Sequence, residues 1–203
     1  MEYTVENERL RVTVTTKGAQ LKSVIRKEDG TEHIWQADAS VWGYHAPILF
    51  PYAGKLKDGI LTVHGKAYDG SRQHGFARNM EHTMVSCDEN TIVLELTDSP
   101  ETYALWPYHF RLVSTFTLEG DTLHHTLTVE NRSEEKMPFG IGYHPAFAVP
   151  FDSKHTFRDY ELRFDAVESP ICLDQCGCGL IGKEHDQRRA GLTGFAKQTA
   201  QRG

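Results

Sequence analysis

The sequence has few of the features that mark membrane or nucleic-acid-binding proteins. It contains no apolar run of about 18 residues, and Met1 to Glu6 form neither a cationic nor an apolar leader segment. Its 22 lysines and arginines against 28 aspartates and glutamates give a net charge of −6, and no stretch gathers the cations on a long basic face. These absences predict a cytoplasmic protein with neither membrane nor nucleic acid as a partner.

Cysteine is also scarce. The chain has four cysteines, and three of them, Cys172, Cys176 and Cys178, fall close together near the C-terminus with His185 nearby. Without a secretion signal, reduced thiols are expected rather than disulfides. The spacing matches none of the common structural zinc frameworks, so the sequence predicts no metal site.

What the sequence does have is an alternation of apolar and polar residues, the pattern of β-strands with one buried face. Its 203 residues, 39% hydrophobic and 25% charged, suit a single globular domain. Gly120 lies between the two longest alternating runs and predicts a hairpin. Few helices are expected, and the many short strands indicate an all-β sandwich or barrel. The expected strands lie at 10–14, 91–97, 110–118, 123–129 and 157–164.

Three segments break the alternation and gather aromatic, glycine, proline and histidine residues. They are 47–59 (PILFPYAGKLKDG), 72–79 (RQHGFARN) and 139–147 (FGIGYHPAF). Binding residues concentrate on loops that a rigid β scaffold presents, and a histidine can donate or accept a proton near neutral pH. His74 and His144 are therefore the candidate acid–base residues, although spacing alone favours structural histidines at strand ends. The pair His124–His125 lies within a strand, where one ring should point inward and the other outward.

Taken together, these three segments resemble the aldose 1-epimerase (galactose mutarotase-like) family, and especially the bacterial mutarotase-like proteins of lactose operons. The sequence WPYHF at 106–110 fits as well, and the resemblance covers residues 1–182. It implies a large twisted antiparallel β-sandwich, C-terminally truncated, with a sugar in an open cleft and neither cofactor nor metal. Residues 183–203 have no periodic pattern and are expected to form a poorly structured tail.

The reaction that the resemblance implies interconverts the α and β anomers of a hexose. Ring opening needs a proton removed from the anomeric hydroxyl and another delivered to the ring oxygen. The resemblance implies that His144 is the general acid, that His74 assists at the ring oxygen, and that sugar is bound by Lys55, Arg78 and Tyr143. Lys55 stands where stronger mutarotase sequences carry arginine, so it would act as a point donor rather than a planar fork.

The resemblance also places the family's general base, a glutamate, and a sugar-binding aspartate beyond residue 203. As replacements for that base, the sequence offers Asp152, Asp159 and Glu161. Losing one positioned proton-transfer group costs a factor of about 10² to 10⁴ in rate, so weak residual activity is compatible with this composition.

Two other functions remain open from the sequence alone. A non-catalytic carbohydrate-binding protein would use aromatic faces, available at Trp35, Trp42, Trp106, Tyr52 and Tyr143. Recognition of a hexose 6-phosphate would need convergent cations, available at Lys55, Lys57, Arg72 and Arg78. The choice of sugar and the oligomeric state are left open.

Overall fold

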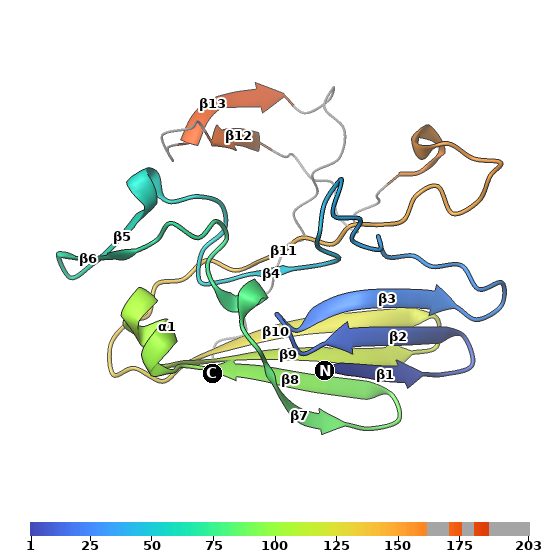
Figure 1. Cartoon of the computed structure of the whole chain (residues 1–203), viewed down its shortest axis with the longest axis horizontal. Helices are drawn as coiled ribbons and strands as arrows, with labels where there is room; N and C mark the ends of the chain where they lie inside the picture. The colour runs from blue at the N-terminus through green and yellow to red at the C-terminus, as the bar shows by residue number, and fades with distance from the viewer. Residues whose placement is uncertain (162–170, 176–180, 187–203) are drawn as a thin grey trace.

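The computed structural model describes residues 1–161, 171–175 and 181–186, and strands predominate in them. Two antiparallel sheets form the body of the protein (Figure 1). The smaller sheet has the order β1-β2-β3. Its strands are β1 (Glu2–Glu6), β2 (Leu10–Thr15) and β3 (Gln20–Arg26).

The larger sheet has the order β10-β9-β8-β7. Its strands are β7 (Thr83–Cys87), β8 (Thr91–Thr97), β9 (Phe110–Glu119) and β10 (Thr122–Asn131). Gly120, at φ 60°, lies in the tight turn between β9 and β10, whose ten residue pairs run in unbroken register. The predicted hairpin is confirmed.

The two sheets meet in one hydrophobic core. Val12 and Val14 of β2 are fully buried, as are Leu94 of β8 and Phe116 of β9, and all four belong to the same cluster. Buried residues alternate with partly or fully exposed ones along β2 and β8, as the sequence pattern predicts. The prediction of an all-β antiparallel sandwich with few helices is therefore confirmed. The short α1 (Pro100–Leu105) is the single α-helix of the described residues.

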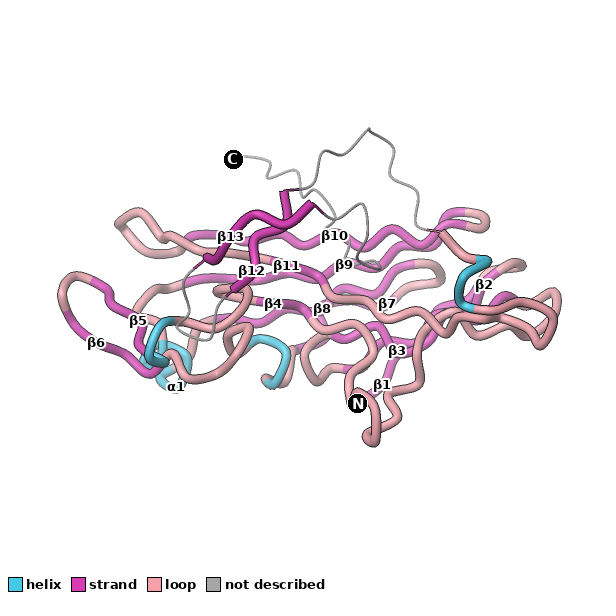
Figure 2. The backbone as a smooth tube through the Cα atoms, turned by 90° about the horizontal axis from the view of Figure 1, so that it is seen from above, coloured by secondary structure: helices cyan, strands magenta, loops and turns pink. Residues whose placement is uncertain are grey.

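Shorter elements are built around this body (Figure 2). Of these, the pair formed by β4 and β11 matters most, because it joins two of the three loop segments that the sequence marks. The short strands are β4 (Ile48–Leu49), β5 (Ile60–Val63), β6 (Lys66–Asp69), β11 (Gly142–Tyr143), β12 (Ile171–Gln175) and β13 (Ile181–Asp186). The 3₁₀ turns are η1 (Lys57–Gly59), η2 (Ala77–Asn79) and η3 (Phe157–Asp159).

The strand predicted at 157–164 is wrong at its beginning, where the chain forms η3 instead. The carboxylate of Asp159 accepts hydrogen bonds from the backbone N–H of Thr156 at 2.6 Å and from its hydroxyl at 2.9 Å, and these bonds favour a turn over an extended chain. Residues 162–164 lie outside the described part. The sequence also predicts a boundary between the sandwich and a tail, between residues 182 and 183, and β13 continues across it. Cys176 and Cys178 also fall outside the described residues.

In β10 the histidine pair behaves as alternation predicts: His124 is exposed, and His125 faces the core side. The His125 ring stacks on Phe116, with 4.0 Å between ring centroids, and its Nε2 shares a hydrogen bond of 2.7 Å with the hydroxyl of Ser114. Burial lowers the pKa of His125 to about 3. The ring is therefore neutral in the folded protein at every physiological pH.

Acid should destabilise the protein through this ring. Below pH 6.5 the His125 ring takes up a proton in the unfolded chain, whereas in the folded protein it stays neutral down to about pH 3. The folded state therefore loses about 2 kcal/mol of stability by pH 5. We expect His125→Leu to reduce the difference in unfolding free energy between pH 7 and pH 5 by about that amount, measured by urea denaturation. Buried His82, with a pKa lowered to about 4, remains and keeps part of the acid sensitivity. An unchanged pH difference would contradict this assignment.

Candidate functional site

The first two loop segments are joined through the backbone of Phe50. Its carbonyl accepts hydrogen bonds from the N–H groups of Phe76 at 3.0 Å and Ala77 at 3.2 Å, and Phe50 and Gly75 form a parallel bridge. Gly75 has a φ of 71°, and a Cβ added to it would lie 2.2 Å from the Phe50 oxygen. Only glycine allows this close approach, which brings segment 72–79 onto segment 47–59.

The third segment, 139–147, docks on segment 47–59 along β4. The N–H of Gly140 donates to the carbonyl of Pro51 at 2.8 Å, and the N–H of His144 donates to the carbonyl of Pro47 at 3.1 Å. Between these bonds, β11 pairs with β4. The three segments that the sequence marks as candidate loops therefore meet in one place, although 59 residues separate the second from the third.

Buried aromatic rings pack around Phe50 and support the junction of the three segments. The ring of Phe50, fully buried, has its centroid 5.3 Å from those of Trp106 and Phe110 and 6.3 Å from that of Phe76. Trp106 is only 3% exposed, so it belongs to the core and not to a sugar-facing surface. The loops rest on a rigid base, which favours precise placement of their polar side chains.

His74 is clamped by the backbone of Gly54. Its N–H donates to the Gly54 carbonyl at 2.7 Å, and its ring Nδ1 accepts a hydrogen bond from the Gly54 N–H at 2.8 Å. The second bond fixes the tautomer, because an accepting Nδ1 leaves the proton of a neutral ring on Nε2. His74 also holds a φ of 67°, a left-handed conformation that is unusual outside glycine and costs energy.

His144 lies beside His74, with 6.4 Å between the ring centroids. The residue is exposed, and its ring meets the edge of Trp42 with a centroid separation of 5.0 Å. Pro145 follows it and restricts its backbone to extended conformations. The structure thus brings together the two histidines that the sequence selects, and one of them is open to solvent.

Arg78 of η2 is the charged neighbour of both rings. Its guanidinium carbon lies 4.8 Å from the centroid of the Tyr44 ring, a cation–π arrangement. Burial lowers the pKa of His74 and of His144, and the positive charge of Arg78 lowers both pKa values further. Both rings are consequently weaker bases than free histidine, whose pKa is 6.5.

Tyr143 and Lys55 are placed differently from this pair. Neighbouring residues of an extended chain point to opposite sides, so the Tyr143 ring points away from His144. Its centroid lies 4.7 Å from that of His125. There it lines an apolar cavity of about 390 Å³ that contains neither His74 nor His144. Its hydroxyl is buried and has no partner in the described part of the chain, and burial raises its pKa. Lys55 is exposed and directly follows Gly54, the residue that clamps His74.

Two of the three candidate replacement bases are engaged locally. The carboxylate of Asp152 contacts the His155 ring at 2.8 Å and accepts from the Lys154 N–H at 2.8 Å, and Asp159 holds the η3 turn. These contacts lower the pKa of both carboxyl groups. In residues 1–161, 171–175 and 181–186, no three histidine, cysteine or acidic side chains are grouped to hold a metal ion.

Three contributors to the site are missed by the motif reading. Gly54 acts through its backbone, Tyr44 through its ring beneath Arg78, and Trp42, singled out only as an aromatic, through its contact with His144. A sequence signal existed for Tyr44 and Trp42, because the aromatic pair stands just before the 47–59 segment.

Among the described residues, none of the helices has the length and apolar character that a membrane span requires.

Comparison with solved structures defines the class of protein. The fold is that of galactose mutarotase-like proteins: the galactose mutarotase related enzyme of Lactobacillus acidophilus matches with a TM-score of 0.75 and 37% identity, over 78% of this chain and 53% of that one. A galactose mutarotase-like protein of Lactobacillus casei ATCC 334 matches with a TM-score of 0.71 and 32% identity, over 76% of this chain and 52% of that one.

The family follows from the sequence itself. The family model for aldose 1-epimerase matches residues 1–190, and the chain belongs to this family. The chromosomal protein LacX of Lactococcus lactis subsp. lactis is 37% identical over 174 residues, which cover 83% of this chain and 58% of LacX. The chain thus spans little more than half the length of the relatives it matches. The family resemblance predicted from the sequence motifs is confirmed.

Proposed function

We propose that the chain catalyses interconversion of the α and β anomers of a hexose by acid–base ring opening. Family membership supports sugar chemistry of this type. The observation that carries the proposal is the pair of imidazoles, 6.4 Å apart between centroids, on two loops that a buried aromatic base holds in place. A pyranose seated against this pair can contact both rings at once.

In the proposed reaction, His144 donates a proton to the ring oxygen as the C1–O5 bond breaks. The proton of the anomeric hydroxyl passes to a solvent water molecule at the same time. The free aldehyde then closes again on either face by the reverse proton transfers. His74, with its Nε2–H directed by the Gly54 clamp, donates a hydrogen bond that stabilises the charge developing on the ring oxygen. This division gives the acid half of the reaction to the described residues.

Two cationic residues are proposed to hold the sugar. Arg78 lies near both imidazoles, and Lys55 adjoins the Gly54 clamp, so each is a candidate donor to sugar hydroxyls. Tyr143 packs against His125 and is left out of the proposed sugar contacts. Location in the cytoplasm, and the absence of nucleic acid as a partner, stay predictions from the sequence.

Polarimetry of freshly dissolved α-galactose or α-glucose tests the proposal directly. We expect the chain to shorten the approach to rotational equilibrium relative to buffer at the same pH, in proportion to protein concentration. The protein-dependent rate should also rise as pH falls from 8 to 6, because the lowered pKa of His144 leaves little imidazolium at neutral pH. Rates equal to buffer for both sugars would overturn the proposal, and a rate rising with pH would reassign His144 as a base.

A further inference from the structure

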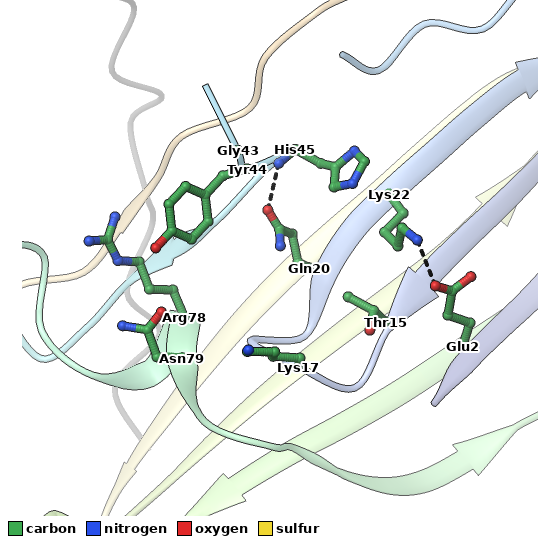
Figure 3. Close-up of a pocket in the computed structure, with 10 residues that line it drawn as sticks. All are labelled: Glu2, Thr15, Lys17, Gln20, Lys22, Gly43, Tyr44, His45, Arg78 and Asn79. Carbon is green, nitrogen blue, oxygen red and sulfur yellow. Dashed lines mark hydrogen bonds and ion pairs between the residues drawn. The ribbon is translucent and has the colours of Figure 1, made fainter. Parts of the chain in front are cut away.

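Arg78 and Tyr44 also line a second cavity, of about 360 Å³, which contains neither His74 nor His144. Its other wall comes from the end of β2 and the start of β3 (Figure 3). The turn between these strands is held tightly against η2: the N–H of Gly18 donates to the Met80 carbonyl at 2.7 Å, and a Cβ on Gly18 would lie 2.5 Å from the Arg78 oxygen. The two walls therefore form one rigid unit.

Gln20 presents an oriented donor to this cavity. Its side-chain oxygen accepts hydrogen bonds from the backbone N–H groups of His45 at 2.7 Å and Ala46 at 3.1 Å. Because two donors require the oxygen on that side, the amide nitrogen is directed away from them, as Figure 3 shows. In the described part of the chain this nitrogen has no acceptor, so its N–H groups are available to a ligand.

Positive charge at the cavity exceeds negative charge. Lys22 is paired with Glu2 at 2.6 Å, and Glu2 supplies the single carboxylate of the described lining. Lys17 has no carboxylate within ion-pair distance among the described residues, and Arg78 adds a further positive charge to the lining. The amide N–H groups of Gln20 and the ammonium group of Lys17 are thus left without a hydrogen-bond acceptor in the described part of the chain.

We propose that this cavity binds the oxyanion group, phosphate or carboxylate, of a small metabolite, with Lys17 and Gln20 as its donors. Charge-assisted hydrogen bonds are the strong ones, and a concave surface with excess positive charge attracts anions even on a protein of net charge −6. A volume of about 360 Å³ lies in the range of small-molecule sites, so the anion is one end of a larger molecule. The inference does not depend on the proposed anomerisation.

Isothermal titration with sodium phosphate and with sodium acetate, at constant ionic strength and with sodium chloride as the control anion, tests the site. We expect saturable binding of phosphate or acetate and none of chloride, and the stronger of the two identifies the chemical source. The absence of saturable binding heat with both phosphate and acetate would overturn the proposal. A binding heat with chloride equal to theirs would also overturn it.

Two variants and a matched control locate the binding. Gln20→Glu retains an oxygen to accept from His45 and Ala46 but turns the donor into a negative oxygen, so binding should fall by at least tenfold. Lys17→Met should weaken binding to a similar extent, whereas Lys27→Met, which removes the same charge from an exposed site paired with Glu6, should change affinity less than twofold. Retained binding in Gln20→Glu with an unchanged melting temperature, or equal losses in both lysine variants, would refute the site.

Discussion

Replacing Gly75 by alanine is expected to destabilise the protein by more than about 4 kcal/mol, or to prevent folding. Two costs combine. A left-handed φ of 71° costs an alanine about 1 to 2 kcal/mol, and the new Cβ would meet the backbone oxygen of Phe50 at 2.2 Å and its carbon at 2.5 Å. Backbone atoms cannot move aside as a flexible side chain can, so the junction between segments 47–59 and 72–79 must open. Urea denaturation followed by circular dichroism measures the loss.

Gly65 provides the matched control. Its φ is 76°, close to that of Gly75, but a Cβ there meets nothing within 4 Å. Gly65→Ala should therefore cost only the conformational part, about 1 to 2 kcal/mol. A similar loss in both variants would show that the close approach at Phe50 contributes nothing to stability.

The parts of the fold that the sequence predicts are those written in a local pattern. Alternation along 10–14 and 91–97 is visible because one face of each strand is buried and the other is solvated. The three loop segments are marked because glycine, proline and histidine interrupt the alternation there, and their meeting around one site is what the family resemblance implies. His74 and His144 are selected by motif, and their proximity follows from the way the loops dock on β4.

The parts that are missed depend on partners far away in the chain. Tyr143 stands next to His144 in the motif, and only the two-residue pairing of β11 with β4 decides that its ring packs on His125. The Gly54 clamp uses backbone atoms, which carry no residue signature. At 157–159, a side chain that bonds to the local backbone turns an expected strand into η3, because such bonds compete with a sheet.

Replacing His144 by alanine is expected to lower the protein-dependent rate of anomer interconversion by about 10² to 10⁴, the usual contribution of one positioned proton donor. Stability should change little, since His144 is exposed and its main ring contact is the edge of Trp42. Polarimetry at pH 6, where the protein-dependent rate is expected to be greater than at pH 8, gives the most sensitive comparison. His124→Ala is the matched control, because it removes an exposed histidine from the outer face of β10, and its rate should equal that of the unaltered chain.

Added imidazole separates a proton donor from a structural role at this position. In His144→Ala the space left by the ring is open to solvent, so free imidazolium can enter and deliver the proton to the ring oxygen that the side chain would have protonated. We expect millimolar imidazole to raise the variant's protein-dependent rate well above the sum of the variant and imidazole acting alone, and to leave the His124→Ala rate unaffected. A rate in His144→Ala equal to that of the unaltered chain would remove His144 from the mechanism. A large loss of rate without rescue, accompanied by a lowered melting temperature, would mean that the ring serves the architecture of the loops and that the proton comes from elsewhere.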